Sequence, residues 1–209
     1  DSNGNAAGSC SGSGTSYTCT GLTNGSAYTF KATATNASLT SDLSTASIAV
    51  TPATLPGAPT SVSAAVTTAG AATVSFTAPA NNGGAALTGF TVISSPGGFT
   101  CSAAANASSC VVTGLTNGTS YTFTVVATNE IGNSVASSSS SAVTPQSAAG
   151  APTTVTATAG DGQASIAFSG AVTNGSTISN YTVKAYDSNG NEVTGATCTT
   201  STSPCTITG

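Results

Sequence analysis

Residues 114–125 read GLTNGTSYTFTV and combine a turn with the start of a strand. The Asn-Gly pair inside the stretch is typical of a tight turn, because both residue types tolerate left-handed backbone conformations. After the turn, large apolar side chains alternate with threonine at Tyr121, Phe123 and Val125. A period of two places these three side chains on one face of an extended chain. The stretch therefore predicts a turn followed by a half-buried β-strand.

Parts of this stretch occur a second time, and corresponding positions lie 93 residues apart. The pentapeptide GLTNG stands at residues 21–25 and 114–118, and the aromatic motif YTF stands at residues 28–30 and 121–123. The linkers follow the same period, with Thr-Pro at residues 51–52 and 144–145 and GAPT at residues 57–60 and 150–153. Self-similarity at a fixed period indicates tandem copies of one structural module.

The middle repeat is complete and alternates apolar with small polar residues throughout. Turn sequences such as PANNGG at residues 79–84 separate the alternating runs, and no run has helical spacing. Seven strands in about 90 residues predict a two-sheet sandwich. The strands are expected over residues 60–67, 72–78, 87–94, 98–103, 109–114, 120–128 and 134–143. The expected core residues are Phe76, Phe90, Leu115, Tyr121 and Phe123.

Six cysteines fall into three local pairs, which are Cys10 with Cys19, Cys101 with Cys110, and Cys198 with Cys205. An even number at near-constant spacing favours disulfides, which form in oxidising compartments. Each bond would close a short loop and add about 2 to 3 kcal/mol in the chain-entropy model. Metal binding is the alternative, but zinc sites need closer pairs with further cysteine or histidine ligands. The chain has no histidine, and we expect no metal or other cofactor.

Charged side chains make up 4% of the chain, with two lysines, six carboxylates and no arginine. Such a chain has no basic patch for phosphate groups, so nucleic acid is excluded as a partner. Histidine, the usual base beside a nucleophilic serine or cysteine, is absent. The carboxylates are scattered rather than paired for glycoside hydrolysis, so we expect no enzyme activity. They are Asp1, Asp42, Glu130, Asp161, Asp187 and Glu192.

The few charged residues suggest two candidate sites. Asp187 and Glu192 flank an Asn-Gly sequence, where a hairpin turn is favoured over a calcium loop because a calcium loop needs more oxygen ligands. Lys31 and Lys184 suggest an isopeptide cross-link to Asn or Asp, whereas ordinary solvated lysines on a strand face are the simpler interpretation.

The middle repeat resembles the fibronectin type III domain, in the form common in bacterial secreted and surface proteins. The resemblance rests on PxxV at residues 59–62, ATVSFTAP at residues 72–79, GFTV at residues 89–92 and LxNGTxY at residues 115–121. It implies that the Tyr121 hydroxyl bonds back to the backbone as a tyrosine corner. One departure is that Phe76 and Phe168 stand where the family usually has tryptophan.

The resemblance implies an all-β fold of tandem immunoglobulin-like, seven-stranded sandwiches with a partial module at each end. Residues 1–52 match the C-terminal half of a module, residues 53–145 a complete module, and residues 146–209 the N-terminal half of a further module. The motif DSNGN occurs at residues 1–5 and 187–191, so the two halves overlap slightly. Either the chain is a window on a longer array, or its halves complete each other between subunits.

Six Asn-x-Ser/Thr motifs are candidate glycan acceptors if the source glycosylates secreted proteins, although this composition alone produces such matches. Their acceptor residues are Asn24, Asn36, Asn106, Asn117, Asn174 and Asn180.

These features predict a non-catalytic structural component of an extracellular filament, stalk or cell-surface array, whose partners are other copies of itself. Surface glycans or a cell-surface ligand are further candidate partners. The alternatives are a spacer in a secreted polysaccharide-degrading enzyme, and an adhesin module that binds through its loops at residues 79–84 and 129–133. An extracellular or cell-surface location is expected, and no apolar run is long enough to span a bilayer.

Overall fold

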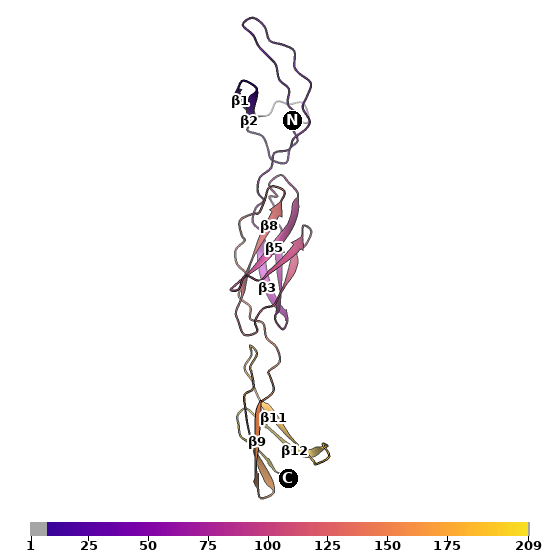
Figure 1. Cartoon of the computed structure of the whole chain (residues 1–209), viewed down its shortest axis with the longest axis vertical. Coiled ribbons are helices and arrows are strands. Elements are labelled where there is room, and N and C mark those ends of the chain that lie inside the picture. Colours follow the sequence, from indigo (N-terminus) through magenta and orange to yellow (C-terminus); the bar gives the residue numbers. More distant parts are fainter. Residues whose placement is uncertain (1–7, 209) are drawn as a thin grey trace. The chain divides into compact units, whose positions relative to one another are not determined.

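The computed structural model describes residues 8–208, which form strands β1 to β13 and no helix (Figure 1). The all-β prediction is therefore confirmed. Nothing in this described span is a helix able to cross a membrane. The DSNGN motif at residues 1–5, Asp1 included, lies outside the described residues. The strands fall into three groups along the sequence, and each group is treated separately.

The middle group forms two three-stranded sheets. One sheet has the order β3-β4-β7, and the other has the order β6-β5-β8 with antiparallel neighbours. The strands are β3 (Thr60–Thr68), β4 (Ala71–Thr77), β5 (Leu87–Ser95), β6 (Thr100–Ala104), β7 (Ser109–Thr113) and β8 (Thr122–Asn129). The two sheets together are called the central sandwich.

The core of the central sandwich follows from the period of two in its strands. On β8 every second side chain is buried, and Phe123 and Val125 are fully inaccessible to solvent. Phe76 of β4 and Phe90 of β5 meet in the middle, with ring centroids 4.8 Å apart. Burying one such side chain contributes about 1.5 to 3 kcal/mol. All five predicted core residues are buried, with exposed fractions between 0% and 5%.

The N-terminal group is a hairpin of β1 (Ser9–Ser13) and β2 (Ser16–Thr20), followed by an extended segment that doubles back on itself. In this segment Tyr28 and Val50 form an isolated antiparallel bridge, as Tyr121 and Val143 do 93 residues later. The repeat seen in the sequence is therefore also a repeat of backbone pairing.

The C-terminal group contains two small sheets. β13 (Cys205–Thr208), β10 (Gln163–Ser169) and β9 (Thr154–Gly160) form one sheet in that order. β11 (Tyr181–Tyr186) and β12 (Glu192–Thr200) form the other. This arrangement repeats β7-β4-β3 and β5-β6 of the central sandwich, and within residues 8–208 no strand pairs with the other side of β11 as β8 pairs with β5. The module boundaries at residues 52 and 145 stay predictions.

Candidate functional site

The cysteines form three disulfides, Cys10–Cys19, Cys101–Cys110 and Cys198–Cys205. Cys101 lies on β6 and Cys110 on β7, so this bond joins one sheet of the central sandwich to the other. Cys198 and Cys205 join β12 to β13 in the same way. The remaining pair lies directly opposite in the β1–β2 hairpin. Within the described part of the chain, no cluster of three acidic, cysteine or histidine residues could hold a metal ion.

In both copies of the repeated motif, a tyrosine hydroxyl forms a hydrogen bond with the backbone of the turn before it. The Thr116 N–H donates to the Tyr121 hydroxyl at 3.0 Å, and the Thr23 N–H donates to the Tyr28 hydroxyl at 2.9 Å. Both tyrosines are buried. The Thr23 N–H bond favours the phenolate and lowers the pKa of Tyr28. These contacts are the tyrosine corner that the family resemblance implies.

Three buried serines run beside β8 and form what we call the serine ladder. The Ser137 N–H donates to the Val125 carbonyl, and the Ser137 Oγ accepts the Val125 N–H, both at 2.9 Å. The same hydroxyl donates to the carbonyl of Ser138, so it stands in for a backbone carbonyl and is itself satisfied. The other members, Ser134 on Ala127 and Ser140 on Phe123, make the same contacts.

The serine ladder corrects the predicted strand over residues 134–143. Its serines are three residues apart, whereas their partners on β8 are two residues apart, so the segment cannot follow a regular antiparallel ladder. The extra residues bulge outward, and Val135 is 76% exposed. The alternation rule missed this because the period is three. The spacing Ser-x-x-Ser-x-x-Ser, present at residues 41–47 and 134–140, was the available signal.

The N-terminal group contains a second copy of the serine ladder. Ser41, Ser44 and Ser47 accept the backbone N–H groups of Ala34, Ala32 and Phe30 at 2.9 to 3.0 Å. Their own N–H groups donate to the carbonyls of the same residues. Here the serines are exposed to solvent, whereas in the central sandwich they are buried.

The loops at residues 79–84 and 129–133, the adhesin alternative, are joined by Asn129. Its amide donates to the carbonyls of Thr54 and Asn82, and its Oδ1 accepts the N–H groups of Ile131 and Gly132. Asn129 is 3% exposed. Its amide therefore holds the two loops together. The exposed residues of the loops are Ala80, Asn81, Asn82, Glu130, Ile131 and Asn133.

Three charged residues of the C-terminal group, Lys184, Asp187 and Glu192, lie in the β11–β12 hairpin, whereas Asp161 lies between β9 and β10. The Asp187 Oδ1 accepts the N–H groups of Asn189 and Asn191, each at 2.9 Å, and the Asn191 bonds lower the pKa of Asp187. Lys184 contacts Glu192 at 2.9 Å, and this bond raises the pKa of Lys184. The structure therefore places Asp187 in a hairpin turn and Glu192 in an ion pair. Lys31, the other lysine, is exposed.

The six candidate glycan acceptors differ in their surroundings. Asn117 is half-buried and its Oδ1 accepts the Gly70 N–H at 2.9 Å, while the Asn174 amide donates to Ala148. Asn36 is exposed and its Oδ1 caps a turn by accepting two N–H groups. Asn106 lies exposed in the turn between β6 and β7. The others, Asn24 and Asn180, are also exposed.

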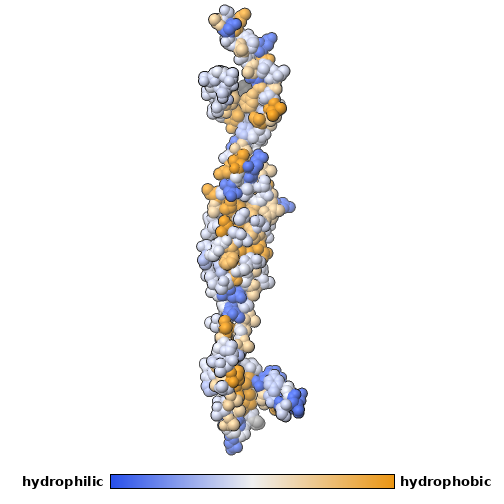
Figure 2. Space-filling view, in the orientation of Figure 1, coloured by the Kyte–Doolittle hydropathy of each residue, from blue (hydrophilic) through white to orange (hydrophobic). Residues whose placement is uncertain are grey.

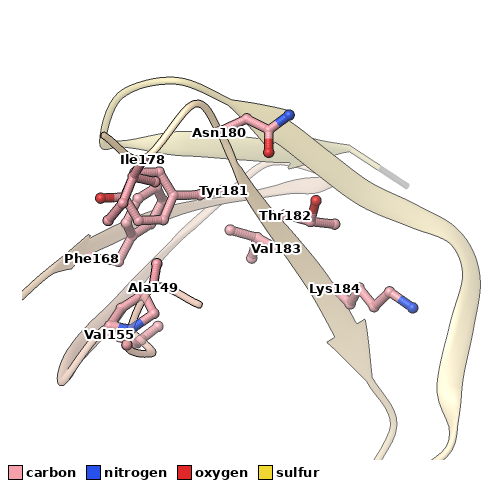
Figure 3. Close-up of a pocket in the computed structure, with 11 residues that line it drawn as sticks. Ala149, Val155, Phe168, Ile178, Asn180, Tyr181, Thr182, Val183 and Lys184 are labelled. Atoms are coloured by element: carbon pink, nitrogen blue, oxygen red, sulfur yellow. The ribbon is translucent and has the colours of Figure 1, made fainter. Parts of the chain in front are cut away.

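The C-terminal group carries an apolar hollow of about 420 Å³, which we call the open face. Figure 3 shows Phe168, Ile178 and Tyr181 gathered on one side of it, with Val183 facing the same space. The rings of Phe168 and Tyr181 are 4.6 Å apart, nearly the spacing of Phe76 and Phe90 in the core of the central sandwich. The open face thus has the side chains of a sandwich core.

Comparison with solved structures gives matches to multidomain chains. Domains A168-A170 of titin are 26% identical over 44% of this chain and 33% of that chain, with a TM-score of 0.41. The FN1–FN3 domains of chicken CNTN1 are 16% identical over 74% and 56%, with a TM-score of 0.43. The twitchin kinase region of C. elegans is 23% identical over 44% and 17%, with a TM-score of 0.40. This chain therefore spans less than two thirds of each.

No curated protein has a significantly similar sequence. The family of the fibronectin type III domain matches residues 57–144, which include all strands of the central sandwich. The tyrosine corner and the two sheets joined at β6 and β7 agree with that match. The central sandwich of this chain therefore belongs to the fibronectin type III family.

Proposed function

We propose that this chain is a non-catalytic structural component of an extracellular filament, stalk or cell-surface array built from tandem fibronectin type III modules. The observation that carries the proposal is the repetition of one set of contacts 93 residues apart. The tyrosine corner and the serine ladder occur in residues 22–52 and again in the central sandwich. Tandem modules with the same internal contacts can form an extended chain of similar units, as a filament or stalk requires.

The surface supports the same proposal. Figure 2 shows that pale residues of near-neutral hydropathy cover most of the visible face, with small, separate strongly hydrophilic or hydrophobic areas. Serine, threonine, glycine and alanine give a surface of this kind, and the net charge is −4 for 209 residues. Neighbouring chains with so little charge repel one another weakly, so they can pack side by side.

An extracellular or cell-surface location is part of the proposal. Three disulfides close short loops in the chain, and disulfides persist in secreted and surface proteins.

The C-terminal group keeps the strand β10 that contains Phe168, but its sandwich core is only partly covered. The disulfide between β12 and β13 supports this thinner core by restricting the unfolded chain.

Electron microscopy of the native secreted material tests this proposal. We expect ordered filaments or arrays with an axial repeat that corresponds to one module. Isolated flexible chains attached to a catalytic domain would instead support the spacer alternative. A single unassembled chain that binds a purified cell-surface glycan through residues 79–84 and 129–133 would support the adhesin alternative.

A further inference from the structure

We propose that the linkers between the repeats are rigid junctions rather than flexible hinges, so that successive modules keep one mutual orientation. This inference rests on the proposed structural function and concerns how the modules of an array are joined. Each junction lies wholly within one of the two compact units of the chain. The first junction comprises residues 23–26, 52–57 and 81–84, and the second comprises residues 116–119, 145–150 and 172–176.

Each linker is bonded to the turn of the preceding repeat. The Gly25 N–H donates to the Pro52 carbonyl at 2.9 Å. The Gly118 N–H donates to the Pro145 carbonyl at the same distance, 93 residues later. A proline ring fixes the backbone φ angle, so the linker is stiff at the residue that accepts the bond. The first residues of the linker therefore cannot move away from the turn without breaking this bond.

Each linker is also bonded to the loop that precedes β5 or β11. Two backbone hydrogen bonds of this kind occur in each junction, with lengths of 2.8 to 3.1 Å. The donor and acceptor residues are Thr54 with Gly83 and Gly57 with Asn81 in the first junction, and Ser147 with Asn174 and Gly150 with Val172 in the second. The linker is thus held at both ends, by the repeat before it and by the module after it.

The two loops share an unusual backbone conformation. Gly83 has a φ of 77°, and Asn174, the residue that accepts the equivalent bond in the second junction, has a φ of 49°. Asparagine is one of the few residues other than glycine that adopt this region. The same geometry is therefore present in both junctions although the residues differ.

An asparagine side chain adds a further bond to each linker. The Asn129 amide donates to the Thr54 carbonyl at 2.8 Å, and the Asn174 amide donates to the Ala148 carbonyl at 2.7 Å. These asparagines belong to different loops, so the two junctions are reinforced by different residues.

The turn and the loop also touch each other directly, through a pair of glycines in each junction. A Cβ atom built on Gly25 would lie 3.2 Å from the Gly84 Cα, and one built on Gly118 would lie 3.3 Å from the Gly175 Cα. In the opposite direction, a Cβ atom on Gly84 would overlap the Gly25 nitrogen, and one on Gly175 would lie 2.6 Å from the Gly118 nitrogen. Backbone meets backbone at these points, so the close approach requires that Gly84 and Gly175 have no side chain.

The two junctions agree although the chain between their parts differs in length. The turn and the linker recur after 93 residues, whereas Gly84 and Gly175 are 91 residues apart. The chain between linker and loop is therefore two residues shorter in the second repeat. The backbone bonds and the glycine contact are the same in both, so they do not follow from residue spacing alone.

Hydrogen exchange of the full chain, followed by NMR, tests this inference. The N–H groups of Thr54 and Ser147 are donors in the junctions, and neither residue is buried, so slow exchange there reports the hydrogen bonds. We expect both N–H groups to exchange at least about tenfold more slowly than in an unfolded chain. Weaker protection at either residue would overturn the proposal.

Two variants place a methyl group between turn and loop, and each should open its own junction alone. We expect Gly84→Ala to speed exchange at Thr54 by at least about tenfold and to leave Ser147 unchanged, and Gly175→Ala to do the reverse. Gly98→Ala is the matched control, because Gly98 also has a positive φ, 62°, but a Cβ atom there meets nothing within 4 Å. Equal effects of Gly84→Ala and Gly98→Ala at Thr54 would contradict the rigid junction.

The Val125 N–H, in the core of the central sandwich, shows whether each variant stays folded. Its exchange should be unchanged in all three variants. Residual dipolar couplings of the weakly aligned, unaltered chain then measure orientation across the second junction. Couplings from β4, β5 and β8 and those from β10 and β11 should fit one alignment tensor, and two different tensors would reject the rigid junction.

The outcome separates this inference from the proposed function. Native filaments built from chains with unprotected junctions would leave the structural function in place and reject the rigid linkers. Protected junctions in a chain that forms no native filament or array would support the rigid linkers and reject the filament.

Discussion

Ser137 uses its hydroxyl group twice, once as an acceptor for a strand N–H and once as a donor to the next carbonyl. Serine is mostly a surface residue, and its burial here is tolerated because both capacities of the hydroxyl are satisfied. In the sequence, the run of serines at residues 137–141 is typical of an exposed polar segment. Its members differ in the structure, since Ser137 and Ser140 are buried and Ser138 is exposed.

Replacing Ser137 with alanine should destabilise the central sandwich by about 1 to 3 kcal/mol, because the buried Val125 N–H loses its acceptor. Ser138→Ala, one residue away on the exposed side, should change stability by less than about 0.5 kcal/mol. Urea unfolding followed by circular dichroism measures both. If the two variants were equally stable, the ladder would not contribute to stability.

The Asp187 turn gives a pH-dependent prediction at the same scale. The Asn191 bonds lower the folded-state pKa of Asp187, so its contribution to the β11–β12 hairpin is present above the usual aspartate pKa of about 3.9 and is lost as the pH falls through the lower folded value. Amide NMR signals of Asn189 and Asn191 should shift in an acid titration with a midpoint below that usual value. In Asp187→Asn this titration should disappear. A midpoint at or above the usual value would contradict the assignment.

At the scale of elements, the sequence predicted most of the central sandwich. The alternating residues predicted β4, β5 and β8, because half-buried strands leave a clear period of two. The segment at residues 134–143 was predicted as a strand and is not one, because side-chain hydroxyls replace part of its ladder and change the period. Cysteine spacing suggested which cysteines pair. It did not indicate that Cys101–Cys110 joins two sheets, which depends on the order of strands in space.

Removing that disulfide with Cys101→Ala and Cys110→Ala together should lower the free energy of unfolding by about 2 to 3 kcal/mol, because the unfolded chain regains the entropy of a short loop. Thermal unfolding of the double variant, compared with the unaltered chain, measures this loss. Removing Cys10–Cys19, which lies within one hairpin outside the central sandwich, should leave the main transition of the sandwich unchanged. Equal losses in both variants would contradict the sheet-joining role.

At the scale of the whole molecule, the sequence predicts tandem modules and a chain with very little charge. The 93-residue period and the near-absence of charge were both visible without a structure. The open face was only partly predictable. The alignment predicts a half-module at residues 146–209, but the exposure of Tyr181 and Val183 could be read only from the structure.

Glycosylation gives a prediction for the whole chain. If the source attaches N-linked glycans, some peptides that contain the six candidate acceptor residues should be heavier than their sequences require. Peptide mapping should then find the modification at the exposed Asn106 before the half-buried Asn117, whose Oδ1 is bonded to the Gly70 N–H. Unmodified peptides at all six acceptor residues would exclude glycans, and modification of Asn117 alone would contradict the assigned order.

Within residues 8–208, the serine ladder also forms the outer edge of its sheet, beside β8, and this has a consequence for solubility. Many β-proteins place lysine on such an edge strand, because its charge prevents aggregation by pairing between the edge strands of two molecules. The central sandwich has no lysine. The edge of its sheet instead bulges at every third residue, and the serine hydroxyls there are already bonded. A strand of another molecule therefore meets no regular row of backbone groups with which to pair. A protein with almost no charge can thus resist amyloid-like association through backbone irregularity.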